Sequence, residues 1–263
     1  MSELLNTNNP LLEKLRIVHG TTIALPSRGL LYPEGVLDPN VLDGEIRIHP
    51  MTIRDEILMR TPDALFSGET IQRVIGRCAP DVLQPLKLHF TDLDFIMLAL
   101  RKISYGPELE INFQHDCEDS KGHSYVVNID ERLNDCIHLD PLLVTEQYEL
   151  HLPEFNQTVH FKPLNAEDMI AILQPDIEWS KEDEEREMIQ MAITQISAVD
   201  DITDRAHIYE WAAQIPARAM RDVRIKLEKL SRWGVTYKFG IKCRDCGQPI
   251  DADIPLNPVS FFT

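Results

Sequence analysis

The sequence has no run of about 18 apolar residues, the length that a helix needs to cross a bilayer. Its start, Met1-Ser2-Glu3, also lacks the basic and then apolar layout of a signal peptide. These absences predict a protein with no membrane span and no secretory leader. We therefore expect the chain to fold in the cytosol.

The motifs of common catalytic sites are missing as well. There is no Gly-x-Ser-x-Gly elbow, phosphate-binding loop, His-Glu-x-x-His pair or Gly-x-Gly-x-x-Gly turn. The nine histidines are scattered singly, and the nearest to clusters are His138 beside Cys136 and the pair His151 and His160. Histidines at strand spacing are more often cross-strand partners than ligands. We expect no enzyme, because only the length of the chain favours a hydrolase.

Basic residues are outnumbered, 26 against 43 acidic ones, which gives a formal charge of −17. This charge repels phosphate backbones and anionic lipids, so nucleic acid and membrane are poor partners. One segment, 216–233, has the opposite balance: Arg218, Arg221, Arg224, Lys226, Lys229 and Arg232. A nucleic-acid face is an alternative there, but pairing with acidic helices or an acidic protein partner is favoured.

Glycine is scarce, with 11 residues, and no low-complexity tract occurs, while hydrophobic residues make up 43% of the chain. A chain of 263 residues with this composition can bury a large core, as one domain or two. The five cysteines are odd in number and fit a reducing compartment better than a disulfide framework.

Hydrophobic periodicity indicates a mixture of strands and helices. Residues 1–20 are polar and then weakly amphipathic, which predicts a flexible arm. A helix should begin at Thr91, with Asp94 completing a capping box, and end before Gly106. The other main elements expected are strands at 44–49, 108–113 and 235–241, and helices at 180–197, 203–214 and 216–233.

Two segments of the chain resemble each other in order and in residue type. Residues 48–55 and 161–168 both read apolar, basic, Pro, apolar, cap, apolar or small, charged, Asp, and Tyr105-Gly106 matches Trp233-Gly234 ahead of a Cys-bearing hairpin. Chance similarity of amphipathic segments is the alternative. We predict an α+β protein of two similar halves, 21–140 and 141–263, each with strands, a helical insert and a Cys hairpin.

The second of these hairpins has the pattern of half a zinc ribbon. Cys243-x-x-Cys246-Gly247 would direct two thiolates to one ion, and tetrahedral zinc needs two ligands more. The repeat points to Cys117 as one of them, although Ser120 stands where a partner of Cys246 would be. Three residues could complete the site: Cys136, His123 or His115. The alternatives are a decayed site with reduced thiols and, less favoured, a redox disulfide between Cys243 and Cys246.

Near the N-terminus, Leu25-Pro26-Ser27-Arg28-Gly29 is followed by Tyr32. Together with the terminal Cys hairpin, this signature resembles the baseplate hub and hub-assembly family of T-even-type contractile phage tails. The resemblance implies a non-enzymatic hub protein or hub-assembly chaperone, whose partners are other baseplate, hub and tail proteins.

The same resemblance implies assembly in the host bacterial cytoplasm, with or without residence in the virion, and leaves the oligomeric state open. Its motif residues carry over as partner-binding positions: Ser27, Arg28, Gly29 and Tyr32. Arg28 is expected to make fixed hydrogen bonds, and Gly29 to allow a tight turn. A purely structural role within the subunit is the alternative, and a zinc-ribbon regulator that binds nucleic acid is the alternative function.

Overall fold

The computed structural model describes residues 20–59, 68–114, 117, 122–142, 144, 148–172 and 192–253. The predicted arm therefore lies outside the described residues except for Gly20, as does the start of the helix expected from residue 180. The fold mixes helices with small antiparallel sheets, which confirms the α+β class. No described helix is both long and apolar enough to span a bilayer.

The elements fall into two series along the chain. The first comprises β1 (Thr21–Ala24), β2 (Glu45–Ile48), α2 (Ile53–Met59), α4 (Glu69–Cys78), the short 3-10 helix η1 (Pro85–Lys87), α5 (Phe90–Tyr105), β3 (Glu108–Phe113), β4 (His123–Asn128) and α6 (Ile129–Asn134). The second comprises β5 (Glu149–Leu152), β6 (Gln157–Phe161), α8 (Ala166–Ile172), β7 (Ile196–Val199), α10 (Arg205–Gln214), α11 (Ala217–Leu230), β8 (Lys238–Lys242) and β9 (Pro249–Asp253).

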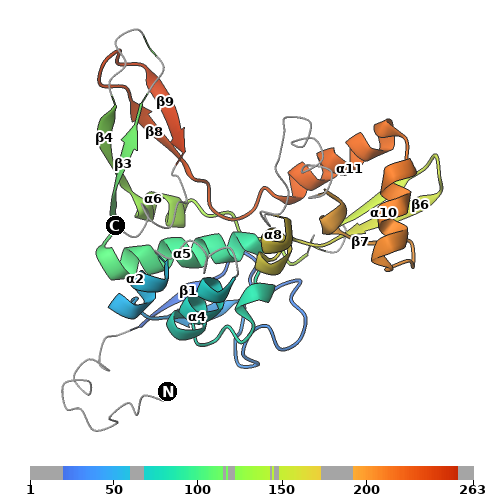
Figure 1. The fold of residues 1–263 in the computed structure, drawn as a ribbon, viewed down its shortest axis with the longest axis horizontal. Helices are drawn as coiled ribbons and strands as arrows, with labels where there is room; N and C mark the ends of the chain where they lie inside the picture. Colours follow the sequence, from blue (N-terminus) through green and yellow to red (C-terminus); the bar gives the residue numbers. More distant parts are fainter. Residues whose placement is uncertain are drawn as a thin grey trace.

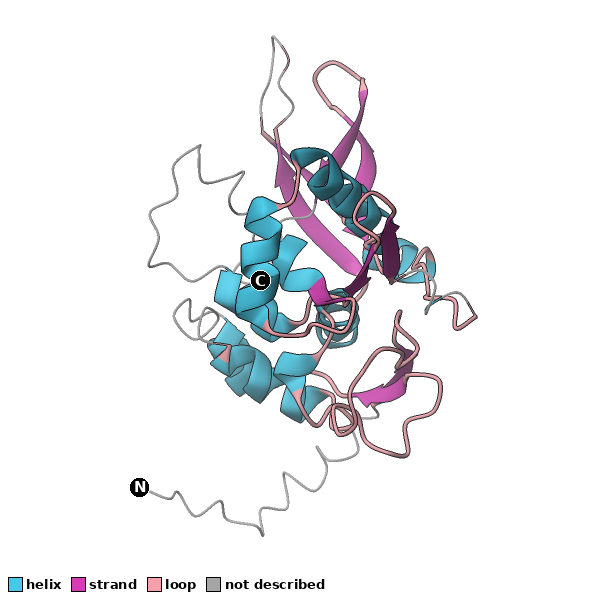
Figure 2. Ribbon diagram, turned by 90° about the vertical axis from the view of Figure 1, so that its right-hand side faces the viewer, coloured by secondary structure: helices cyan, strands magenta, loops and turns pink. Residues whose placement is uncertain are grey.

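The first hydrophobic core is built around α5, which supplies Leu93, Ile96 and Leu100. Ile46 and Ile48 of β2 are buried in it while Arg47 faces outward, as the period-two alternation predicts. In Figure 1, α2, α4 and the β1–β2 hairpin lie on one side of α5, and β3–β4 rise from its other side. Figure 2 shows the helices in the middle of the molecule with the long strands above them.

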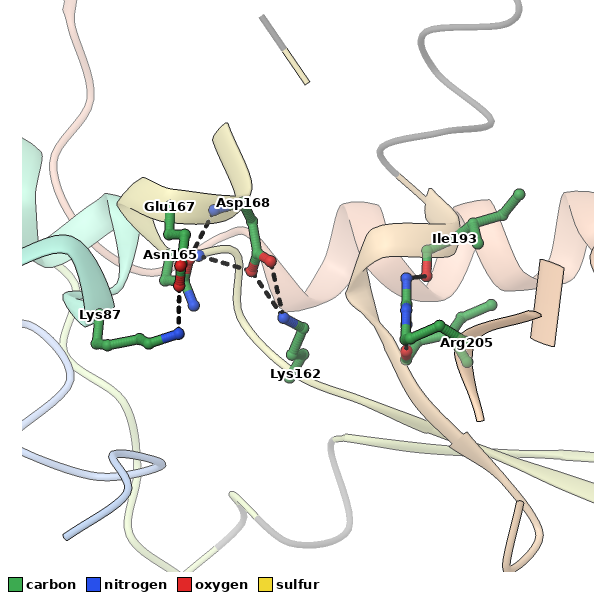
Figure 3. Close-up of polar contacts among 8 residues, drawn as sticks. Lys87, Lys162, Asn165, Glu167, Asp168, Ile193 and Arg205 are labelled. Carbon is green, nitrogen blue, oxygen red and sulfur yellow. Dashed lines mark hydrogen bonds and ion pairs between the residues drawn. The ribbon is translucent and has the colours of Figure 1, made fainter. Parts of the chain in front are cut away.

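The second core is formed by the sheet β5-β6-β7 and the helices α10 and α11. The apolar stripe of α11 that the sequence shows is buried in it: Met220, Val223, Leu227 and Leu230. The guanidinium of Arg205, at the start of α10, donates to the carbonyls of Ile196 at 2.6 Å and Ile193 at 3.1 Å (Figure 3). These bonds fix the start of β7 against α10.

The last hairpin, β8–β9, packs with the first core rather than the second. Phe239 and Ala252, paired across the hairpin, are buried in the α5 core. The Arg132 guanidinium of α6 lies 5.0 Å from the Phe239 ring centroid and donates to the Lys238 carbonyl at 3.1 Å. The second core, 148–230, is therefore bracketed in the chain by segments of the first.

The segments that the sequence aligns have the same local structure. Each follows a hairpin and a proline with a helix in whose first turn an aspartate accepts a hydrogen bond from the backbone N–H of the cap residue. At α2, the backbone N–H and hydroxyl of Thr52 donate to Asp55 at 2.8 and 2.6 Å. At α8, the backbone N–H of Asn165 donates to Asp168 at 3.3 Å, and the N–H of Asp168 donates to the Asn165 side chain at 2.8 Å. The parallel supports the duplication, which stays a prediction.

The helices α5 and α8 cap each other. The backbone N–H of Phe90, the first residue of α5, donates to the Leu164 carbonyl at 2.7 Å, and that of Ala166, the first of α8, donates to Leu88 at 3.0 Å. An ion pair between Lys87 and Glu167 spans the same junction (Figure 3). The predicted capping box of Thr91 and Asp94 is wrong: α5 begins at Phe90 with no side-chain cap, because the lead-in to α8 supplies the missing acceptor.

Trp233 joins the two cores beside this junction. Its ring makes an edge contact with His89 at 6.0 Å, and its indole N–H donates to the hydroxyl of Tyr148 at 3.1 Å. Both Trp233 and Tyr148 are buried. A buried hydrogen bond of this kind costs more to remove than an exposed one.

We therefore expect Trp233→Phe to lower the free energy of unfolding by about 1–3 kcal/mol, because it removes the buried donor to Tyr148. Trp211→Phe is the matched control, since its indole bonds the half-buried Gln157, which can turn to water. Urea denaturation of both variants measures the difference. Equal losses in the two variants would contradict the role of Trp233 at the junction.

Candidate functional site

The loop that holds Ser27, Arg28 and Gly29 is fastened to the buried carboxylate of Asp92, in the first turn of α5. The backbone N–H of Ser27 donates to Asp92 Oδ1 at 2.9 Å, and its hydroxyl donates to Oδ2. Ser27 and Asp92 both have no exposed surface. The same serine oxygen accepts from the N–H of Gly29 at 3.1 Å. Ser27 therefore sets the turn from within the subunit.

Tyr32 closes the loop onto the same carboxylate. Its hydroxyl donates to Asp92 Oδ2 at 2.7 Å and accepts from the backbone N–H of His89 at 2.9 Å. Its ring stacks on the His89 imidazole, with centroids 3.9 Å apart and planes 9° from parallel. The His89 ring donates in turn to the Leu30 carbonyl at 3.0 Å.

Burial changes the acid–base behaviour of these groups. It raises the pKa of Asp92 to about 6, although hydrogen bonds from Ser27 and Tyr32 oppose the rise. Burial also lowers the pKa of His89 to about 4, so the imidazole is neutral at pH 7. Its one ring proton is on Nε2, which donates the hydrogen bond to the Leu30 carbonyl. The pKa of Tyr32 is raised well above its ordinary value by burial and by the nearby Asp92.

Unlike the buried Ser27, Arg28 faces outward. Its φ is +54° and that of Gly29 is +75°, so two successive residues occupy the left-handed region. Gly29 thus makes the turn for which the sequence singles it out. The Arg28 side chain is exposed, and among the described residues its guanidinium has no hydrogen bond or ion pair. Gly44 packs against this backbone so closely that a Cβ there would lie 2.6 Å from the Arg28 carbonyl carbon.

A surface cleft of about 460 Å³ lies along the loop. Its lining includes three charged residues, Arg28, Asp43 and Glu34, together with the side chains of Tyr32, Pro33, Leu37, Pro39 and Val41. Two leucines of the same loop segment are also exposed, Leu31 by 39% and Leu42 by 75%. A cleft lined by both apolar and charged side chains suits a side chain of another protein.

Three of the cysteines named from the sequence come together at the far end of the molecule. The sulfurs of Cys117, Cys243 and Cys246 lie within 4.8 Å of one another. Cys117 belongs to the tip of the β3–β4 hairpin, and the other two to the turn of β8–β9. Burial and the neighbouring thiols raise the pKa of Cys117 to about 11.

The proposed fourth ligands are placed differently. Cys136 is not in this cluster; it lies at the bridge between Ile137 and Gly234, with Asp92 near enough to contribute to its raised pKa. The imidazole Nε2 of His123 is 2.9 Å from Asp245 Oδ1, in the turn between the two cysteines. His115 lies outside the described residues.

The sequence also matches a known protein family. The family model, described as T4 bacteriophage base plate protein, matches residues 33–263, most of the chain. The chain belongs to this family. No curated protein and no solved structure gives a significant match. The protein is therefore a phage baseplate protein that associates with other tail or baseplate proteins, as the resemblance implied.

Sequence reasoning missed the central residue of this baseplate protein's loop network, Asp92. The pattern Thr91-Asp92-Leu93-Asp94 offers two carboxylates, and the capping rule selects Asp94. The sequence did offer one indication, which is that Asp92 stands in a largely apolar stretch. A carboxylate buried there needs hydrogen-bond donors from elsewhere in the chain. Only the tertiary structure shows that the donors come from Ser27 and Tyr32.

Asp92 should make stability depend on pH in the direction set by its raised pKa. The Asp92 carboxyl keeps its proton up to about pH 6 in the folded protein but only to about pH 4 in the unfolded chain. The stabilisation that comes from this protonation is therefore fully present below about pH 4 and is lost as the pH rises through 6. Relative to Asp92→Asn, the free energy of unfolding of the wild type should fall by about 3 kcal/mol between pH 4 and 7.

Urea titrations at several pH values measure this difference. Asp201→Asn, at an exposed position, is the control for removing one carboxylate. A difference between wild type and Asp92→Asn that stays constant with pH would show that Asp92 is not buried as described.

Proposed function

We propose that the protein is a non-enzymatic component or assembly factor of the baseplate hub, and that it binds a neighbouring tail protein through the loop of residues 28–44. The observation that carries the proposal is the exposed Arg28 guanidinium on a backbone that Asp92 holds rigid. A loop backbone that is already held in one conformation loses little further entropy on binding. Arginine is also among the residues most often dominant in protein interfaces.

The surroundings of Arg28 favour a protein partner. The cleft beside it combines apolar with charged side chains in its lining, and Leu31 and Leu42 of the same loop segment are exposed. A partner segment with a carboxylate for Arg28 and an apolar side chain for the cleft would satisfy both features. Asp43 and Glu34 in the lining would disfavour a second acidic group.

The buried groups with shifted pKa values also support a non-enzymatic role. Such groups often mark active sites. Here Asp92 is fully buried, and both of its oxygens accept hydrogen bonds from Ser27 and Tyr32. A carboxylate in this position cannot reach a substrate, so its function is to hold the loop.

Arg28→Ala should weaken binding to the hub partner by about tenfold or more, while leaving the melting temperature unchanged, because the side chain has no partner among the described residues. Arg224→Ala, at an exposed position of α11, is the matched control. The assay co-expresses the chain with the hub and spike proteins of the same phage and follows co-migration by size exclusion.

Two outcomes would contradict the proposal. If no tail protein co-migrates with the wild type, the hub assignment fails. If the partner binds Arg28→Ala as well as the wild type, the loop is not the contact. Mass spectrometry of mature particles separates the two forms of the proposal, since a hub subunit remains in the virion and an assembly chaperone does not.

A further inference from the structure

The β3–β4 and β8–β9 hairpins lie against each other without sharing a sheet. Each is a separate two-stranded ribbon. Their facing side chains join one core, with Leu109, Ile111 and Tyr125 from the first ribbon and Phe239 from the second. An isolated two-stranded ribbon is at best marginally stable in water. Each ribbon therefore depends on its contacts with the other.

Those contacts reach the tips of both ribbons. The backbone N–H of Arg244 donates to the Tyr125 hydroxyl at 3.2 Å, and its guanidinium lies 5.1 Å from the Tyr125 ring centroid. On the other side, His123 meets Asp245 at 2.9 Å. The thiols of Cys117, Cys243 and Cys246 lie in the same region, between residues of both tips.

The backbone of the second tip suits two ligands on one turn. The N–H of Cys243 donates to the Gln248 carbonyl at 2.9 Å, and the N–H of Gly247 returns to the Cys243 carbonyl at 2.9 Å. Gly247 has a φ of +71°, which lets the chain reverse directly after Cys246. Both thiols are thereby held by the turn, and Cys117 approaches from the opposite ribbon.

We propose that Cys117, Cys243 and Cys246 bind one Zn²⁺ ion as thiolates and that the ion fastens the two hairpin tips together. In tetrahedral zinc sites with bonds of about 2.3 Å, sulfurs lie roughly 3.8 Å apart, which fits the observed cluster. Thiolates also select soft or borderline ions such as Zn²⁺ over Mg²⁺ and Ca²⁺. The three thiolates and the ion leave one net negative charge, and Arg244 and Lys242 of the same tip offset it.

His123 is not in the cluster that the three sulfurs form, and its Nε2 meets Asp245 Oδ1 at 2.9 Å. We therefore assign the fourth position to water, which would complete the tetrahedron around the ion.

Elemental analysis of the full chain tests the site. The protein is purified with a phosphine reductant and without a metal-affinity tag, loaded with excess Zn²⁺, and desalted. Wild type and Cys136→Ser should retain about one equivalent of zinc. Cys246→Ser, which removes an exposed thiol, should bind zinc at least about 100-fold more weakly, because even the loss of a supporting contact costs 10–100-fold.

A second measurement on the wild type avoids dependence on the folding of a variant. Alkylation followed by peptide mass spectrometry should show that Zn²⁺ protects Cys117, Cys243 and Cys246 and leaves the reactivity of Cys136 unchanged. A wild-type chain that retains no zinc overturns the proposal. So does equal retention by Cys246→Ser, or protection of Cys136 together with loss of zinc in Cys136→Ser.

Discussion

The buried carboxylate of Asp92 is the constraint on which the exposed loop depends. A carboxylate with no exposed surface is costly unless donors surround it. Among the described residues, the side-chain and backbone groups that donate to it all come from one loop: the N–H and hydroxyl of Ser27 and the hydroxyl of Tyr32. The loop must therefore adopt the conformation that satisfies Asp92. Its left-handed residues follow from that requirement, because the turn that brings Ser27 and Tyr32 inward passes through Arg28 and Gly29.

The same network connects the two hydrophobic cores. Tyr32 stacks on His89, His89 contacts the edge of Trp233, and Trp233 donates to Tyr148 of the second core. Beside this chain of contacts, α5 and α8 exchange backbone hydrogen bonds at their first residues. The start of α5, which has no side-chain cap, is thus satisfied by the segment that leads into α8.

Local periodicity predicted much of the fold and little of the site. Alternation at 44–49 and the apolar stripe from Met220 to Leu230 are local patterns, and the structure confirms both. The capping box of α5 was predicted wrongly, because the acceptor at the start of that helix is the Leu164 carbonyl, far along the chain. The sequence named Ser27 and Tyr32 but gave no reason to pair them with Asp92, since pairing between distant segments leaves no periodic signal. The meeting of Cys117 with Cys243 and Cys246 could be anticipated because the sequence pattern that predicts an internal repeat relates the two hairpins.

The Asp92 network explains the backbone conformation of Arg28 but not the choice of an arginine at that position. A long β-carbon-bearing side chain at a φ of +54° costs on the order of 1 kcal/mol relative to glycine, which adopts this region freely. The neighbouring motif residues have roles within the subunit: Ser27 and Tyr32 bond Asp92, and the N–H of Gly29 bonds Ser27 in the turn. Arg28 makes no such bond among the described residues and extends its charge into solvent beside the cleft. The Asp92 network lies within the subunit, whereas the Arg28 side chain on the loop that it fixes faces outward. A contact with a neighbouring baseplate protein requires both a fixed loop and an exposed side chain.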